Sequence, residues 1–186
     1  MRMSSVALLA LLALPACAPK AAAPSAATLR DTAGGTLTVP GDFARSKLTV
    51  LVFYAEHCPC FRVHEPRLRE LASAYADRGV RLVFVDSEVS ATSEHDAKVA
   101  AERGLSAIVL DPGASLADSV GADYATYTVV FDSEGRIRFR GGIDSDKERL
   151  HDDATPYLRD ALDDLLGGHE PRLSEAKVLG CALQKR

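Results

Sequence analysis

Residues 48–66, LTVLVFYAEHCPCFRVHEP, place a strand pattern, two cysteines and the start of a helical pattern in one stretch. Leu48 to Tyr54 is an unbroken β-branched, aliphatic and aromatic run, which is typical of a strand covered on both faces. From Arg62 to Ala76, apolar residues recur at helical spacing. A buried strand that passes into a helix through two thiols predicts an α/β domain with a reactive site at the junction.

Strand and helix patterns alternate on both sides of this stretch. Gly104 and Gly167-Gly168 end two helical patterns, and Ser133-Glu134-Gly135 is a hairpin signal. The predicted strands are residues 36–39, 48–54, 80–85, 107–110, 128–132 and 136–140, and the predicted helices are residues 62–76, 92–103, 115–120 and 153–166. This order predicts one three-layer α/β domain over residues 29–168, with a central mixed sheet flanked by helices.

Length and composition agree with a single folded domain. The chain has 186 residues, of which 47% are hydrophobic, and this is enough to bury one core. The formal net charge is −4, so the sequence carries no electrostatic signature of a nucleic-acid partner. We expect a monomer without a bound cofactor.

The first residues read as an export signal. Residues 1–3 carry a positive charge, and the apolar stretch 6–14 is shorter than the roughly 20 residues that span a bilayer. Residues 14–17, Leu-Pro-Ala-Cys, resemble the lipobox of bacterial lipoproteins. The resemblance implies a signal peptide over residues 1–16 and a lipid-modified Cys17 at the mature N-terminus. The alternative is an ordinary signal peptide with a coincidental cysteine.

Two segments flank the predicted domain. Residues 17–28 are rich in Ala and Pro, and this composition predicts a tether rather than packed structure. Residues 169–186 form a tail that carries Cys181. A lipid on Cys17 would hold the domain in the bacterial cell envelope, facing the oxidising periplasm. Ala18 stands where the inner-membrane retention signal of some Gram-negative bacteria has Asp, so an outer-membrane address stays open.

The ordered motifs resemble the thioredoxin superfamily, and in particular its extracytoplasmic redoxin branch. The resemblance covers residues 30–166 and rests on VLVFYAEHC before a helix, on VVFDSEGRIRFRGG, and on the last amphipathic helix. The Gly-Cys pair in the tail also resembles the ending of some redoxins. The family implies a thioredoxin-like fold and thiol–disulfide exchange with envelope proteins or small thiols.

The family motif Cys-x-x-Cys is replaced here by Cys58-Pro59-Cys60. In thioredoxins the first cysteine usually lies eight residues before a helix proline, and Cys58 lies eight residues before Pro66. This register implies that Cys58 holds the nucleophile position and that Phe61 replaces the second thiol of the family.

Three further positions depart from the family pattern. His57 replaces the Trp before the first cysteine, and Val52 replaces a buried carboxylate. Tyr127 stands where the family has a cis-proline opposite the active site. We expect a trans bond before Tyr127, because a cis bond before a residue other than proline costs about 2.5–4 kcal/mol.

The predicted position of Cys58 favours its thiolate form. A helix N-terminus stabilises an anion through unpaired N–H groups and aligned peptide dipoles, and a protonated His57 would act in the same direction. Cys58 is therefore the predicted nucleophile, Cys60 the first resolving candidate and Cys181 the second. Cys181 has an equally open structural interpretation, as a disulfide that pins the tail to the domain.

Other functions stay open at this point. Copper or zinc could be held by four neighbouring side chains: His57, Cys58, Cys60 and His64. A peroxidase is less favoured, because Leu51 and Ala55 replace the Pro and Thr of the peroxiredoxin motif. A third alternative is a binding lipoprotein without catalysis.

Polar residues elsewhere are expected on the surface. The acidic run at residues 144–146 reads as a solvated loop, and Arg67 and Arg69 as an exposed helix face. His64, at the start of the same helix, is also expected to be a surface residue unless it binds metal.

Overall fold

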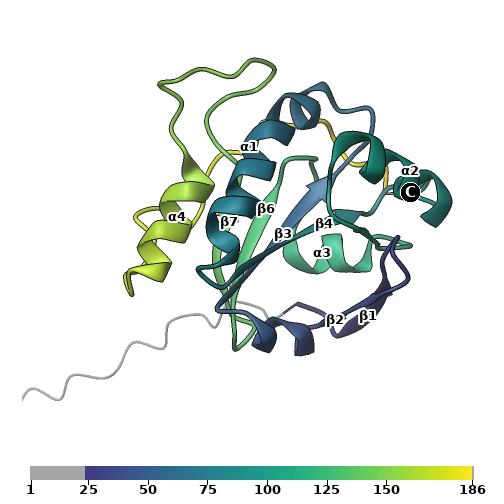
Figure 1. The fold of residues 1–186 in the computed structure, drawn as a ribbon, viewed down its shortest axis with the longest axis horizontal. Helices are drawn as coiled ribbons and strands as arrows, with labels where there is room; N and C mark the ends of the chain where they lie inside the picture. The colour runs from purple at the N-terminus through teal and green to yellow at the C-terminus, as the bar shows by residue number, and fades with distance from the viewer. Residues whose placement is uncertain (1–23, 186) are drawn as a thin grey trace, which may run out of the picture.

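A five-stranded mixed sheet forms the centre of the protein (Figure 1), with strand order β5-β4-β3-β6-β7. The computed structural model describes residues 24–185, so the predicted signal peptide and Cys17 lie outside the described residues. The elements in chain order are β1 (Ala27–Arg30), β2 (Thr36–Val39), η1 (Gly41–Arg45), β3 (Leu48–Tyr54), α1 (Pro59–Ala76), β4 (Val80–Asp86), α2 (Ser93–Arg103), β5 (Ile108–Leu110), α3 (Ser115–Val120), β6 (Thr128–Asp132), β7 (Ile137–Gly141) and α4 (Tyr157–Leu166).

The sheet is parallel on one side of β3 and antiparallel on the other. Strand β3 pairs in parallel with β4, and β4 pairs in parallel with β5. On its other side β3 pairs antiparallel with β6, which continues antiparallel to β7. Every residue of β3 is buried, in agreement with its continuous apolar sequence.

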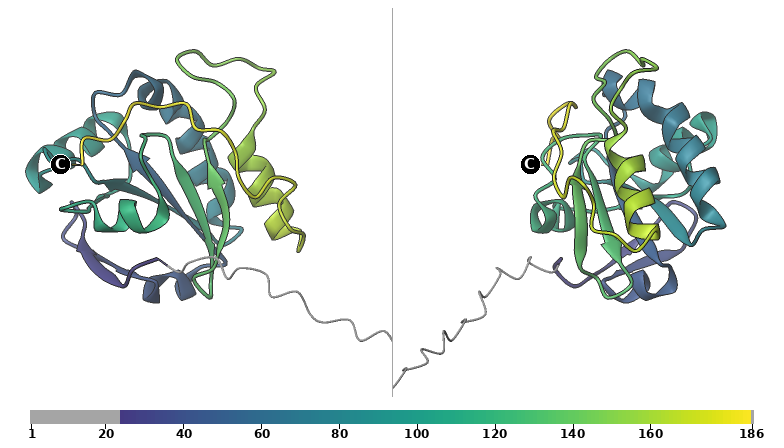
Figure 2. Two further views of the ribbon diagram at one scale, coloured as in Figure 1. Left: turned by 180° about the vertical axis from the view of Figure 1, so that it is seen from behind. Right: turned by 90° about the vertical axis from the view of Figure 1, so that its left-hand side faces the viewer.

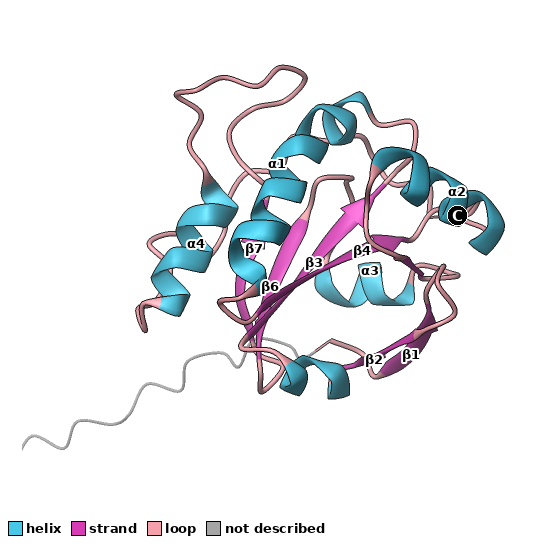
Figure 3. Ribbon diagram, in the orientation of Figure 1, coloured by secondary structure: helices cyan, strands magenta, loops and turns pink. Residues whose placement is uncertain are grey.

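Helices cover both faces of this sheet, which gives the predicted three layers (Figures 2 and 3). Helices α1 and α4 lie on one face, while α3 and the C-terminal tail lie on the other (Figure 2, right). The α/β thioredoxin-like fold expected from the sequence is confirmed. No helix within residues 24–185 combines the length and apolar character that a membrane span requires.

The observed elements differ from the predicted ones mainly at their ends. Helix α1 begins at Pro59 rather than at residue 62, because Pro59 fits a first helical position and Cys58 acts as the N-cap. Helix α4 begins at Tyr157 rather than at residue 153, because Pro156 is its N-cap. Strand β1, which pairs with β2 in a separate antiparallel ribbon, was not predicted from the sequence.

The C-terminal tail, residues 169–185, runs as an extended segment from α4 across the sheet to the loop after β4. Its first part lies beside β7, where the backbone of Arg140 hydrogen-bonds with Ser174 and Ala176. Its last part joins the loop after β4 through the N–H of Val89, which donates to the carbonyl oxygen of Gln184 at 2.8 Å. The tail therefore covers the open edge of β7, an edge that would otherwise expose unpaired backbone groups.

Candidate active site

Cys58 lies at the junction between β3 and α1, where it is the N-cap residue of the helix. Its sulfur accepts hydrogen bonds from two backbone N–H groups, those of Phe61 and Cys181, each at 3.4 Å. The Cys58 side chain is only 1% exposed. Two N–H donors and the positive end of a helix dipole form an environment that suits an anionic sulfur.

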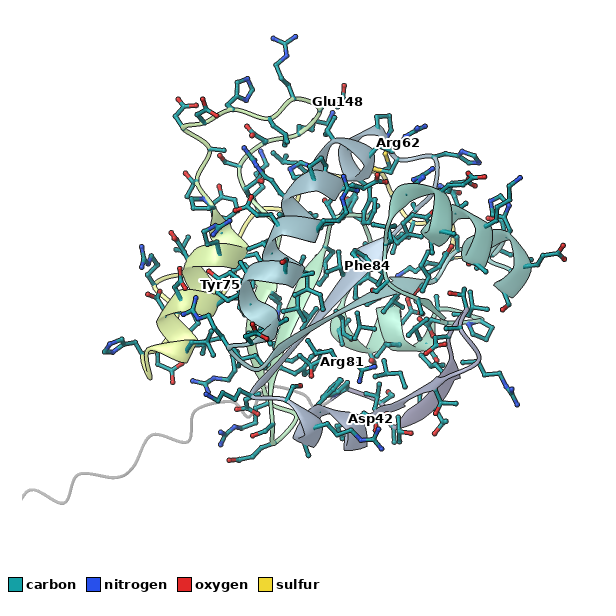
Figure 4. All side chains as sticks on the ribbon, viewed as in Figure 1. Asp42, Arg62, Tyr75, Arg81, Phe84 and Glu148 are labelled. Carbon is teal, nitrogen blue, oxygen red and sulfur yellow. The ribbon has the colours of Figure 1, made fainter. Side chains whose placement is uncertain are left out.

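Three sulfur atoms meet at this point. The Sγ atoms of Cys58, Cys60 and Cys181 all lie within 4.8 Å of one another, and all three thiols are free. Figure 4 shows sulfur atoms, in yellow, beside Arg62 at the N-terminal end of α1. The structure thus brings a thiol from the tail to the two thiols of the Cys-x-Cys segment.

The three thiols differ in their surroundings. Burial, followed by the neighbouring Cys58, raises the pKa of Cys60. Burial and then the same neighbour raise the pKa of Cys181 to about 12. Cys60 and Cys181 are therefore held as thiols at neutral pH, while the two N–H donors point at the Cys58 sulfur.

The tail reaches Cys58 by pairing with the loop that precedes β6, residues 123–125. The Ala125 N–H donates to the Cys181 carbonyl oxygen at 2.9 Å, and the Leu183 N–H donates to the Asp123 carbonyl oxygen at 2.9 Å. Tyr124 and Ala182 form the antiparallel bridge between these two bonds. The tail thus adds a short strand-like segment beside the site.

Gly180 allows this close approach of two backbones. A Cβ atom built at Gly180 would overlap the carbonyl oxygen of Ala125. Glycine lacks a Cβ atom, so this position accepts the contact and Cys181 can follow directly at the Cys58 sulfur. The Gly-Cys pair noted in the sequence therefore has a steric reason.

We expect Gly180→Ala to loosen the tail. Amide hydrogen exchange at Ala125, whose N–H bonds to Cys181, should accelerate about tenfold or more, because the added methyl group breaks this contact. Gly41→Ala is the matched control, since a Cβ there meets Thr38 only at an ordinary distance of 3.4 Å. Unchanged exchange at Ala125 in Gly180→Ala would contradict the steric argument.

Tyr127 and Phe61, both singled out by the family register, are packed in the core. The Thr126–Tyr127 peptide bond is trans, as expected, because the cis bond among residues 24–185 is Val39–Pro40. The Tyr127 hydroxyl donates to the Val120 carbonyl oxygen at 3.3 Å, and burial raises the pKa of Tyr127. Phe61 is fully buried, so at this position the chain has a core side chain.

Thr126 adopts a left-handed backbone conformation, with φ of 70°. This conformation is rare for a β-branched residue and is costly unless the surroundings impose it. The Thr126 N–H donates to the Phe53 carbonyl oxygen at 3.0 Å, and its hydroxyl donates to the Leu179 carbonyl oxygen at 3.3 Å. The residue next to the site is therefore held between β3 and the tail.

The two histidines proposed as metal ligands are placed elsewhere. The side chain of His57 is 91% exposed and its Nε2 lies 3.5 Å from a Glu56 carboxylate oxygen. His57 does line a cavity of about 260 Å3 next to Cys58 and Cys181. His64 is not a surface residue, being 1% exposed.

His64 uses both ring nitrogens in hydrogen bonds inside the protein. Nδ1 bonds to the Cys60 carbonyl oxygen at 2.6 Å, and Nε2 bonds to Asp144 Oδ1 at 2.9 Å. Both partners are acceptors, so both ring nitrogens act as donors and the ring is cationic. Burial alone would lower the pKa of His64, but the bonds to Asp144 and Cys60 raise it. His64 therefore ties the first turn of α1 to the loop before α4 and has no nitrogen left for a metal.

The expectation of a solvated acidic loop at residues 144–146 is wrong. Asp144 is 4% exposed and Asp146 is 7% exposed. Arg67, which was expected on an open helix face, is paired with both of these carboxylates at 2.5 and 2.9 Å. Opposite charges on α1 and on this loop neutralise each other. The sequence did not reveal this pairing, because the charges are far apart along the chain. Arg69 is partly exposed, as expected.

Replacing His64 with leucine should lower the free energy of unfolding by about 2–4 kcal/mol. The change leaves buried Asp144 without one of its two cationic partners, and breaking a buried ion pair from one side is costly. Denaturant unfolding measures the loss. Lys98→Ala is the control, because its ion pair with Glu102 is exposed and such pairs contribute about 0.5 kcal/mol or less. If His64→Leu lowers the free energy of unfolding by less than about 1 kcal/mol, as the loss of an exposed ion pair would, the buried His64–Asp144 pair does not stabilise the fold as argued.

Comparison with known proteins places the chain in a family. The family model described as AhpC/TSA matches residues 18–140. Among curated proteins, none matches the sequence.

Two solved structures resemble nearly the whole chain. A hypothetical protein from Sinorhizobium meliloti superposes with a TM-score of 0.80 at 23% identity, covering 91% of this chain and 96% of its own. An uncharacterized conserved protein from Geobacillus kaustophilus gives 0.80 at 24% identity, covering 90% and 93%. A peroxidoxin from Mycobacterium tuberculosis gives 0.55 at 18% identity, covering 63% and 81%. These similarities support the thioredoxin-like fold. The family match shows that the chain belongs to the AhpC/TSA family of thioredoxin-like redoxins.

Proposed function

We propose that this redoxin is a thiol–disulfide oxidoreductase that uses Cys58 as its nucleophile and Cys181 as its resolving thiol. The observation that carries the proposal is the convergence of three free sulfur atoms within 4.8 Å at the N-terminal end of α1. The helix N-terminus and two N–H donors stabilise the Cys58 sulfur as an anion, which is the attacking form in thiol–disulfide exchange.

The reaction has two balanced steps. The Cys58 thiolate attacks a substrate disulfide, so that one substrate sulfur leaves as a thiolate and the other stays bound to Cys58. The Cys181 sulfur, after loss of its proton, attacks the Cys58 sulfur, which forms the Cys58–Cys181 disulfide and releases the second substrate thiolate. Two electrons pass from the protein to the substrate, and the reverse sequence oxidises a dithiol.

Cys181 is better placed than Cys60 for the second step, although Cys60 was the first resolving candidate predicted from the sequence. Only one residue separates Cys58 from Cys60 at the start of α1, so a disulfide between them would close a small, constrained ring. Cys181 lies on an extended segment whose N–H already contacts the Cys58 sulfur. The tail can adjust without unwinding α1, and this favours Cys181.

The substrate would approach through the cavity of about 260 Å3 beside Cys58 and Cys181. Its lining includes Ala55, His57, Glu88 and Gln184. Substrates of this site would be protein disulfides or small thiols in the cell envelope. The predicted lipid on Cys17 would hold the domain at the membrane, facing the oxidising periplasm in which disulfides form.

Trapping of a mixed disulfide tests this function. In Cys181→Ser the first step proceeds and the second does not, so a Cys58-linked substrate adduct should accumulate and be visible by intact-protein mass. If Cys60 resolves instead, the adduct should appear only in Cys60→Ser. Absence of an adduct in both single variants and in the double variant would overturn the oxidoreductase proposal and leave a binding role.

A further inference from the structure

We propose that the reduced form of the protein binds one Cu(I) ion through the three sulfur atoms of Cys58, Cys60 and Cys181. The assignment is independent of the thiol–disulfide proposal, although a disulfide between any two of these cysteines would exclude the ion. The site differs from the ligand set expected from the sequence, which combined two of the thiols with histidines.

The positions of the sulfur atoms fit a three-coordinate ion. A metal–thiolate bond of about 2.3 Å places three sulfurs in a triangle roughly 4 Å on a side. The three Sγ atoms already lie within 4.8 Å of one another, so less than about 1 Å of contraction per side closes the site. Side-chain rotation of the tail cysteine, which is the least buried of the three, can shorten the two distances that involve the Cys181 sulfur.

The donor set selects a soft ion. Thiolates favour Cu(I), zinc and iron–sulfur clusters, and structural zinc sites take four ligands in a tetrahedron. Within the described residues the grouped donors are these three cysteines alone. His64 has both nitrogens engaged, and His57 is 91% exposed beside Glu56. Three sulfurs without a fourth protein ligand favour Cu(I) over zinc.

The surroundings also suit a charged thiolate–copper centre. Cys58 and Cys60 are 1% and 2% exposed, so these two residues are largely shielded from bulk water. The negative charge of the thiolates is opposed by the positive end of the α1 dipole, at whose N-cap Cys58 lies. The tail is held beside the three sulfurs by its backbone pairing with residues 123–125.

Anaerobic titration of the reduced full chain with Cu(I), supplied as its bicinchoninate complex, tests this site. We expect one Cu(I) per chain and an X-ray absorption spectrum with three sulfur neighbours. Cys181→Ser should retain two sulfur neighbours and weaken binding about tenfold or more, since even outer-shell changes at metal sites cost about 10–100-fold. His57→Ala should bind as the unmodified chain does.

A second variant covers the case in which Cys181→Ser fails to fold. Gly180→Ala keeps all three thiols but moves the tail, so it should also weaken Cu(I) binding while leaving the thiol count unchanged. The assignment would be overturned if the unmodified chain takes up no Cu(I), shows only two sulfur neighbours, or binds zinc more strongly than Cu(I). It would also be overturned if Cys181→Ser binds Cu(I) with the same affinity as the unmodified chain. The mixed-disulfide experiment uses metal-free protein, so either proposal can fail alone.

Discussion

Replacing Cys58 with serine is expected to lower the rate of disulfide reduction by about a thousandfold or more. A serine hydroxyl stays protonated at neutral pH, so the anion that attacks the substrate sulfur is lost. Losses of this order or larger are typical when an enzyme's nucleophile is removed. The rate is measured by following thiol release from a chromogenic aromatic disulfide.

The other cysteines provide matched controls for this result. Cys181→Ser should keep the first release of thiol as a single burst but lose turnover, because the second step has no resolving thiol. Cys60→Ser should keep both steps. His57→Ala should change the rate less than about tenfold, because a single exposed charge makes only a modest electrostatic contribution. If Cys58→Ser stays active while Cys181→Ser loses its burst, the tail cysteine is the nucleophile and our assignment is wrong.

Replacing Asp86 with asparagine is expected to raise the free energy of unfolding by about 2–4 kcal/mol at pH 8. Asp86 ends β4, is 3% exposed, and accepts a hydrogen bond from the Glu88 N–H at 2.8 Å. Burial, together with the neighbouring Asp96, raises the pKa of Asp86 to about 7. Asp96 is 1% exposed and its pKa is raised by burial as well.

The sign of the effect follows from the raised pKa. Below the unfolded-state pKa of about 3.9, Asp86 is protonated in both states and burial of its carboxyl group costs no ionisation energy. As the pH rises towards the folded-state pKa of about 7, the unfolded chain releases its proton first, so the native state loses stability. Asparagine has the same shape and no charge, so it removes this loss and can still accept from Glu88.

Denaturant unfolding at two pH values checks this prediction. Asp86→Asn and the unmodified chain should differ by less than about 1 kcal/mol near pH 3.5 and by the full amount at pH 8. Asp152 is exposed, so Asp152→Asn should differ from the unmodified chain in free energy of unfolding by the same small amount at both pH values. A destabilised Asp86→Asn at pH 8 would mean that the carboxylate is needed in its charged form.

The fold was largely predictable because its strands and helices carry strong local patterns. The run from Leu48 to Tyr54 is apolar throughout, and the structure places it in the middle of the sheet, between β4 and β6. The starts of α1 and α4 were less predictable, because they depend on Pro59 in the first helical position of α1 and on Pro156 at the N-cap of α4. Strand β1 was missed because it is a four-residue strand in a two-stranded ribbon.

The site was predictable only where its residues are close in the sequence. Cys58 and Cys60 follow a strand pattern directly, so their position at a helix N-terminus could be expected. The return of Cys181 depends on backbone pairing of the tail with Arg140, with residues 123–125 and with Val89, and backbone groups leave no pattern in the sequence. The His64–Asp144 bond was missed because its two side chains are 80 residues apart in the sequence.

The most direct test of the account is to map the disulfide that forms in the full chain under mild oxidation. The reduced protein is oxidised, its remaining thiols are alkylated, and the digested peptides are identified by mass spectrometry. We expect a Cys58–Cys181 link with Cys60 alkylated, and the link should disappear again under mild reductant. A Cys60–Cys181 link, or a Cys58 that remains alkylated as a free thiol throughout, would contradict it.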